Sequence, residues 1–142
     1  MEMNWISFAA AVVAQMLIGY IWFHPAVMGK MHAKANGMEV KDMKPKNAAM
    51  AYGTMVLLTI FFTLFLHANV TGPGQDVSPS GHSFATFGHG VFHGILLTIM
   101  IIIPLFATPA MFERRGWGWF IVHAGHWSAR AIVAFGILSA WR

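Results

Sequence analysis

The segment from Phe120 to Trp141, FIVHAGHWSARAIVAFGILSAW, decides how this chain folds. About 20 apolar residues span the hydrocarbon core of a bilayer, so its length and apolar content predict a membrane-crossing helix. Yet the segment contains His123, His126 and Arg130, while Glu113 is the only acidic residue near it in the sequence. A charge at the bilayer centre costs from about 3 to more than 10 kcal/mol, depending on the reference state, so such residues indicate a function or a specific partner.

The composition of the whole chain also indicates a membrane protein. Of 142 residues, 57% are hydrophobic and only 10% are charged, whereas soluble domains carry about 25% charged residues. These charges are too few to cover a water-facing surface. The chain contains no cysteine, which excludes disulfides and thiolate metal ligands. The basic residues cluster beside apolar segments, and this favours an orientation signal over a nucleic-acid surface.

Four segments are long and apolar enough to cross a bilayer. They cover residues 5–23, 48–66, 84–106 and 117–141. The sequence therefore predicts an all-α integral membrane bundle of four transmembrane helices, forming one domain over residues 1–142. Pro25 is expected to end the first span, Pro104 and Pro109 to bound the third, and Asn47 to cap the second.

The basic residues of the loops predict the orientation of the bundle. The first loop contains five of them, Lys30, Lys34, Lys41, Lys44 and Lys46. The third loop contains Arg114 and Arg115, and the second loop, residues 67–82, contains no lysine or arginine. Because basic loops stay in the cytoplasm, both termini are expected on the non-cytoplasmic side of an inner (plasma) membrane.

The first loop contains the stretch AVMGKMHAKANG, residues 26–37. Met28, Met31 and Ala35 would share one face of a helix that ends at Asn36 and Gly37. This pattern fits a short helix lying on the membrane surface. A solvated basic loop is an equally good interpretation.

Several motifs together resemble one protein family. They are GYIWFHPAVMGK (19–30), NAAMAY (47–52), FERRGWGWFIVHAGHW (112–127) and GILSAW (136–141). With a length near 140 residues, the chain is similar to the DUF1761 family of small four-span membrane proteins. The resemblance covers essentially the whole chain and implies the fold and topology. Since the family has no assigned biochemical activity, the resemblance implies no catalytic residues.

The polar residues of the fourth span form one stripe. His123, His126 and Arg130 are spaced i, i+3 and i+7, which places them on one helical face. In the third span, His89 and His93 also share a face. Because a short loop joins these two spans, they should be antiparallel neighbours. Counting residues from the loop places His93 and Arg130 at similar depth, so the two polar stripes are expected to face each other.

Other residues in the spans support close helix packing and polar contacts. Gly90 and Gly94 have the small-xxx-small spacing that lets another helix or a flat ligand approach closely. Gln15 of the first span and Thr59 and Thr63 of the second span add polar groups.

Four interpretations of the polar groups remain open. In the first, the histidines and Gln15 form an interhelical hydrogen-bond network, but this leaves Arg130 without a carboxylate. In the second, the protein is an accessory subunit or homo-oligomer, and a partner completes the stripe. In the third, His89, His93 and His126 bind a divalent metal ion, or His93 and His126 hold haem b. In the fourth, the protein is a small transporter or proton relay.

The sequence favours a non-catalytic function. It contains no nucleotide-binding loop, no paired carboxylates and no cysteine nucleophile. A subunit of a membrane complex is the first expectation, and a binder of a small ligand or cofactor is the alternative. The candidate ligand- or partner-binding residues are Arg130, His126, His93, His89, His123 and Gln15.

Overall fold

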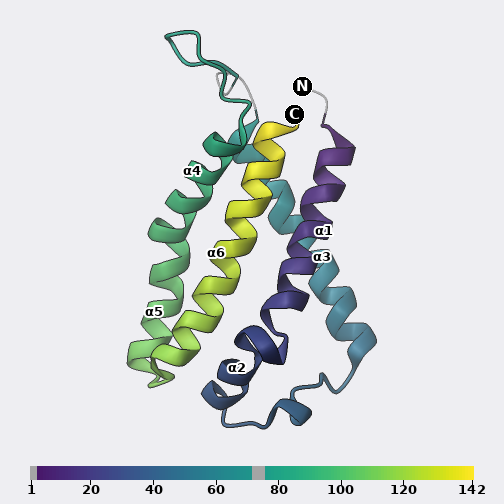
Figure 1. The fold of residues 1–142 in the computed structure, drawn as a ribbon, viewed down its shortest axis with the longest axis vertical. Helices are drawn as coiled ribbons and strands as arrows, with labels where there is room; N and C mark the ends of the chain where they lie inside the picture. Colours follow the sequence, from purple (N-terminus) through teal and green to yellow (C-terminus); the bar gives the residue numbers. More distant parts are fainter. Residues whose placement is uncertain (1–2, 72–75) are drawn as a thin grey trace.

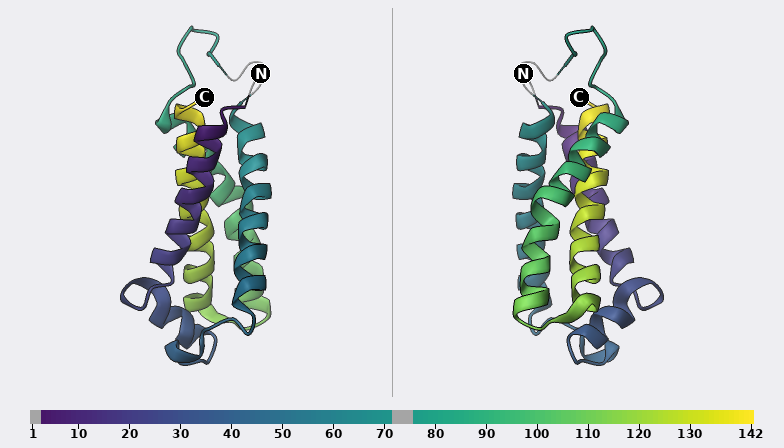
Figure 2. Two further views of the ribbon diagram at one scale, coloured as in Figure 1. Left: turned by 90° about the vertical axis from the view of Figure 1, so that its right-hand side faces the viewer. Right: turned by 90° about the vertical axis from the view of Figure 1, so that its left-hand side faces the viewer.

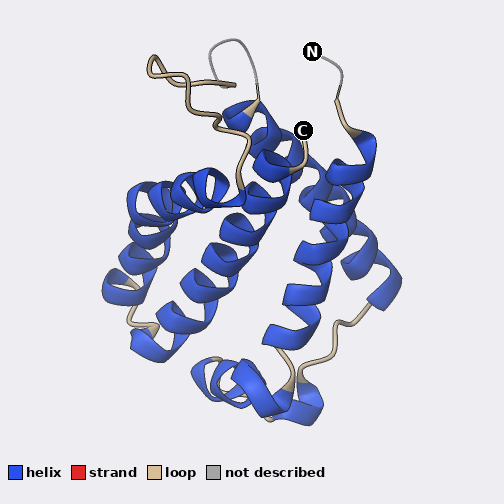
Figure 3. Cartoon of the chain, turned by 45° about the horizontal axis from the view of Figure 1, so that its top comes forward, coloured by secondary structure: helices blue, strands red, loops and turns tan. Residues whose placement is uncertain are grey.

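A computed structural model describes residues 3–71 and 76–142, and helices dominate this part of the chain (Figure 3). The four longest helical segments are α1 (Trp5–Trp22), α3 (Ala48–Val70), the continuous run from α4 to α5 (Phe87–Phe112) and α6 (Gly116–Ala140). Each is long and apolar enough to cross a membrane. The all-α fold and the four spanning helices predicted from the sequence are therefore confirmed.

The helices run up and down, so both termini lie at one end of the bundle (Figure 1). The turn between α5 and α6 and the segment that joins α1 to α3 lie at the opposite end, as the views in Figure 2 also show. The two lysine- and arginine-rich loops therefore share one end, called here the basic end. Which end faces the cytoplasm stays a prediction.

Side-chain caps fix the beginnings of α1 and α3. The Oδ1 atom of Asn4 accepts hydrogen bonds from the backbone N–H groups of Ile6 and Ser7 at 3.1 and 3.2 Å. Oδ1 of Asn47 accepts one from the N–H of Met50 at 3.0 Å. These caps satisfy backbone donors that have no partner within the helix, and the predicted cap at Asn47 is confirmed.

A short helix does follow α1 at the basic end. A π turn, η1 (Pro25–Gly29), leads into α2 (Lys30–Ala35), and Gly37 follows with a positive φ of 64°. Gly29 is required because a Cβ atom there would lie 2.9 Å from the carbonyl carbon of His24. The segment is therefore helical, as the first interpretation expects, and its position on the membrane surface stays a prediction.

The third span does not end at its prolines, so the boundary predicted there is wrong. Helix α4 (Phe87–Leu97) continues through a π turn, η3 (Thr98–Ile102), into α5 (Ile103–Phe112). The π turn lies immediately before Pro104, which has no N–H group to donate inside this continuous helical run. Pro109 lies inside α5 near its end and removes only one backbone hydrogen bond.

Glycines allow α4 and α6 to pack closely, as the small-xxx-small spacing predicts. A Cβ atom on Gly94 would lie 2.5 Å from the Cα atom of Ile132, and one on Gly90 would clash with the carbonyl group of Phe135. Phe135 also belongs to an apolar core cluster with Ala11, Leu66, Val70, Ala134 and Leu138. The glycine contacts therefore fix which side of α6 faces α4.

Candidate functional site

Arg130 is buried in the middle of the bundle, with only 1% of its surface exposed. Its Nη2 atom donates a hydrogen bond to Oγ1 of Thr59 on α3 at 2.7 Å. Its Cζ atom lies 4.5 Å from the centroid of the Trp127 ring, a cation–π geometry. No salt bridge involving Arg130 is found among the described residues, so neutral groups provide its observed contacts.

A second buried polar group, the side-chain amide of Gln15 on α1, belongs to the same polar centre. Its Nε2 atom donates to Oγ1 of Thr63 at 2.7 Å. The Thr63 hydroxyl donates to the carbonyl of Thr59, and the Thr59 hydroxyl donates to the carbonyl of Met55, both at 2.7 Å. Because both threonine protons are used in this way, their oxygens act as acceptors. The network therefore fixes the Gln15 amide with Nε2 toward Thr63.

Four buried polar atoms at this centre have no hydrogen-bond partner within the described chain. They are Nε and Nη1 of Arg130, Oε1 of Gln15 and Nε2 of His126. Leaving a buried polar group unsatisfied costs about 1–3 kcal/mol, and more when the group is charged. In most proteins such groups are paired, so this concentration of four unpaired atoms makes the centre the candidate functional site.

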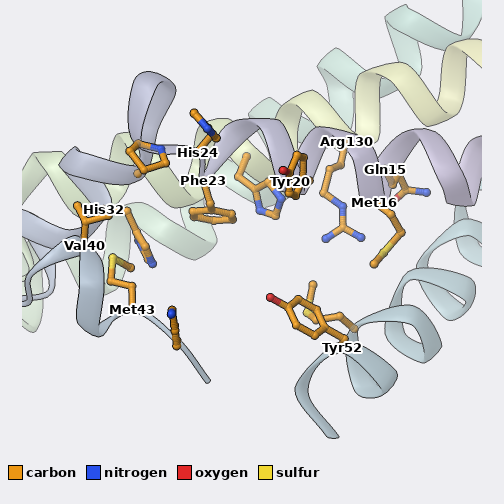
Figure 4. A pocket seen from close by; sticks show the side chains of 16 residues that line it. Gln15, Met16, Tyr20, Phe23, His24, His32, Val40, Met43, Tyr52 and Arg130 are labelled. Carbon is orange, nitrogen blue, oxygen red and sulfur yellow. The ribbon is translucent and has the colours of Figure 1, made fainter. Parts of the chain in front are cut away.

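These residues line a cavity of about 830 Å³ between α1, α3, α6 and the segment that joins α1 to α3. We call it the Arg130 cavity. Its lining consists of Gln15, Met16, Gly19, Tyr20, Phe23, His24, Pro25, Gly29, His32, Val40, Met43, Lys44, Tyr52, Met55, His126 and Arg130. In Figure 4 the Arg130 guanidinium points from its helix toward the cavity. The lining contains two permanent cations and no carboxylate, so it favours an anion.

His123 and His126 of α6, which the sequence predicts to bind a ligand or partner, lie beside this cavity and contact α1 and α2. The His126 ring centroid is 4.8 Å from that of Phe23, and His123 packs 5.1 Å from His32 of α2. His32 also lines the cavity. Partial burial lowers the pKa of His32 below its ordinary value of 6.5. The ring therefore favours its neutral form at neutral pH.

His89 and His93, the other two histidines predicted to bind a ligand, lie on α4, away from this cavity. Nε2 of His93 is 3.1 Å from Nε2 of His89, and the His89 ring stacks on Phe84 at 4.5 Å. The expectation that the two polar stripes face each other is therefore wrong. Ile132 contacts α4 through Gly94, and a residue two positions away on a helix points about 200° around it. Arg130 is thus turned away from α4, toward α1 and α3.

This arrangement also separates His126 from His89 and His93, the other two histidines expected to bind a metal. His93 lies next to Phe135, with ring centroids 5.8 Å apart. His126 is nine residues before Phe135, about 13 Å along the helix. Within residues 3–71 and 76–142, no group of three or more histidine or acidic side chains is placed to hold a metal ion. The structure likewise does not bring His93 and His126 together as axial ligands of a haem.

The sequence did not reveal the residues around the mouth of the cavity. Tyr20, Lys44 and Tyr52 line it, but they come from two helix ends and a loop. A signal was present elsewhere on α3, because Thr59, Thr63 and His67 follow one another at i, i+4 and i+8 on one face of that helix. That spacing indicates a polar strip on α3, but it does not indicate which residues of the other helices the strip contacts.

The fold and the site together define a four-helix, membrane-type bundle with a buried arginine, glutamine and threonine centre. Residues 6–139 match a family described as protein of unknown function, DUF1761. The chain therefore belongs to the DUF1761 family, and the match covers nearly all of it. No curated protein and no solved structure matches the chain.

Proposed function

We propose that this protein is a membrane binding protein for a small amphipathic anion, which it holds in the Arg130 cavity without transforming it. One observation carries the proposal. Among the described residues, the buried guanidinium of Arg130 has two nitrogen atoms without a partner and lines a cavity that contains no carboxylate.

The charge of the ligand follows from the cost of burying Arg130. An uncompensated charge inside a protein is strongly unfavourable. A carboxylate or phosphate would accept charge-assisted hydrogen bonds from Nε and Nη1, which are about twice as strong as neutral ones. Oε1 of Gln15 would accept a hydrogen bond from a hydroxyl or amine group of the same ligand.

The size and apolar character of the ligand follow from the rest of the lining. A volume of about 830 Å³ lies within the range of cavities that hold small molecules. Met16, Phe23, Val40, Met43 and Met55 offer apolar contacts in the same cavity. A ligand with an acyl chain or ring system beside an anionic head would match both the cationic centre at Arg130 and the apolar lining.

The geometry favours a ligand over a partner subunit, which was the first expectation from the sequence. Arg130 is 1% exposed and faces a cavity between helices of its own chain. A small molecule reaches such a position more readily than a side chain of another subunit. Lys44 lines the mouth of the cavity and belongs to a loop at the basic end. If that end faces the cytoplasm, as the loop charges predict, the mouth opens toward the cytoplasmic side.

Mass spectrometry of the purified protein tests this function. Protein extracted from its native membrane with a mild detergent should release one small anion in negative-ion mode. The Arg130→Gln variant should lose this anion, because Gln provides no positive charge at that position. Lys46→Gln, which also removes one positive charge but lies outside the cavity lining, should retain it.

Two results would contradict the proposal. One is a wild-type protein that carries no small anion, and the other is equal retention of the anion by Arg130→Gln. Far-ultraviolet circular dichroism of each variant checks that the helices remain folded. If Arg130→Gln does not fold, Gln15→Leu provides the second comparison, with partial loss of the anion expected.

A further inference from the structure

A second cleft lies at the basic end, between α2 and the beginning of α6. Its volume is about 600 Å³, and no residue is shared with the Arg130 cavity. The residues that line it are Lys30, Met31, Lys34, Ala35, Arg115, Gly118 and Trp119. We call it the α2–α6 cleft.

Three cations surround the α2–α6 cleft, and its lining contains no acidic residue. Lys30 and Lys34 are one turn apart on α2, so they lie on the same side of that helix. Arg115 contributes the third charge, and its Nε atom donates to Oε2 of Glu113 at 2.7 Å. Even with this ion pair counted, the cleft carries a net positive charge and favours an anionic group.

The remainder of the lining is apolar and aromatic. The Cζ atom of Arg115 lies 5.1 Å from the centroid of the Trp119 ring. A Cβ atom on Gly118 would lie 3.9 Å from Cγ of Met31, so α2 packs closely on α6 here. The ligand therefore meets positive charge and apolar surface in the same cleft.

The position of the cleft indicates the membrane boundary. It lies at the first turn of α6, a helix long and apolar enough to span a bilayer. The neighbouring Trp117 is 64% exposed, and tryptophan is enriched at the level of lipid headgroups. On α2, Ala33 is buried while Lys30 and Lys34 are exposed. A basic cleft beside the end of a membrane helix suits the phosphate of a lipid headgroup.

We propose that the α2–α6 cleft binds the phosphate of an anionic phospholipid headgroup. The three cations hold the phosphate, and Met31 and Trp119 contact the glycerol and upper acyl region. This site is independent of the Arg130 cavity and of the ligand proposed there. A soluble phosphate compound shares the charge but lacks the apolar part that Met31 and Trp119 would contact.

Native mass spectrometry with two lipids of identical acyl chains tests the proposal. Purified protein is titrated with phosphatidylglycerol or with phosphatidylcholine, and the bound fraction is measured. Wild type should bind phosphatidylglycerol more tightly. The Lys30→Gln/Lys34→Gln variant should lose about tenfold or more of that affinity, since each basic residue near a charged membrane surface contributes about 1 kcal/mol.

Matched controls separate this site from general charge effects. Lys41→Gln/Lys46→Gln removes the same charge from the same loop but outside the cleft, and should change the affinity less than about twofold. Equal losses in the two double variants, no preference over phosphatidylcholine, or full displacement by millimolar inorganic phosphate would each overturn the lipid site.

Discussion

Arg130 is stabilised in the bundle interior by a neutral hydroxyl and an aromatic ring. Thr59 accepts one hydrogen bond from its Nη2 atom, and Trp127 lies under its guanidinium. A threonine can do this because its own proton is donated to the carbonyl of Met55. The hydroxyl oxygen of Thr59 is thereby available as an acceptor. In the same way, Thr63 donates its proton to the carbonyl of Thr59 and accepts a hydrogen bond from Nε2 of Gln15.

Replacing Thr59 tests this polar network. Thr59→Val keeps the shape of the side chain but removes the acceptor of the Arg130 hydrogen bond. We expect a loss of about 1–3 kcal/mol in the free energy of unfolding, the usual cost of leaving a buried donor unsatisfied. Thr54→Val, at an exposed position of the same helix, should change it by less than about 0.5 kcal/mol. Equal effects of the two substitutions would contradict the network, and denaturant titration in detergent measures both.

At the scale of single residues, the sequence predicts which polar side chains lie in the spans but not which of them contact one another. It identifies Arg130 as a cation without a carboxylate, and Gln15 as a polar residue in the first span. It does not reveal that Thr59 is the partner of Arg130, because this contact depends on how α3 and α6 are rotated. The rotation of α6 is set by its contacts with Gly90 and Gly94, and these two glycines belong to another helix, α4.

At the scale of helices, the contact between α4 and α6 offers a matched pair of glycine substitutions. Gly94→Ala would place a Cβ atom 2.5 Å from the Cα of Ile132, so the helices must separate. We expect a loss of about 1–3 kcal/mol in the free energy of unfolding from this overpacking. At Gly88 a Cβ atom would meet nothing within 4 Å, so Gly88→Ala should be neutral or stabilise by up to about 1 kcal/mol. A Gly94→Ala protein as stable as Gly88→Ala would contradict the packing.

The attachment of α2 to α6 should depend on pH through His32. Its pKa is lowered by burial in the folded protein, so below about pH 6.5 the unfolded chain binds more protons at this residue. The stabilisation from His32 is therefore present above pH 6.5 and is lost as the pH falls from there toward the lowered value. His123 is the titratable group that faces its ring from α6.

Unfolding temperatures at pH 7.5 and 5.5 measure this effect. We expect His32→Gln to lose less stability on acidification than wild type. His82→Gln, at an exposed loop position, should behave as wild type does. An identical pH response of wild type and His32→Gln would contradict a role for His32.

The helices themselves were largely predictable because long apolar segments dominate the sequence. The predicted spans at 5–23 and 117–141 agree with α1 and α6 to within one residue at each end. The end of the third span was not predictable, because the helix continues past the prolines that suggest an end, through the π turn η3. Single π turns are rare insertions in α-helices, so the apolar pattern of this span did not predict η3.

At the scale of the whole molecule, the two basic loops share one end and the termini share the other (Figure 1). With the positive-inside rule this arrangement predicts that the termini face away from the cytoplasm. The chain has no cysteine, so single cysteines can be introduced as labels. Ser80→Cys should react with a membrane-impermeant maleimide in intact cells, and Lys46→Cys only after permeabilisation. The reverse pattern would contradict the orientation.

The Arg130 cavity is a property of the assembled bundle and was not predictable from any one segment. Its lining comes from α1, α3, α6 and the segment between α1 and α3. The sequence stripe of His123, His126 and Arg130 indicates a polar face on α6. Only the packing shows that this face meets α1 and α3, and that α4 lies on the opposite side.

The most direct test of the central claim is the change in unfolding temperature when an amphipathic anion is added. Purified protein in a non-ionic detergent is heated with dodecyl phosphate or with uncharged dodecanol at the same concentration. A ligand that binds only the folded state raises its stability. In the Lys30→Gln/Lys34→Gln variant, whose α2–α6 cleft lacks two of its three cations, we predict a rise with dodecyl phosphate alone. Adding Arg130→Gln to this variant should abolish the rise. An equal rise with and without Arg130→Gln, or equal effects of the two amphiphiles, would contradict anion binding at Arg130.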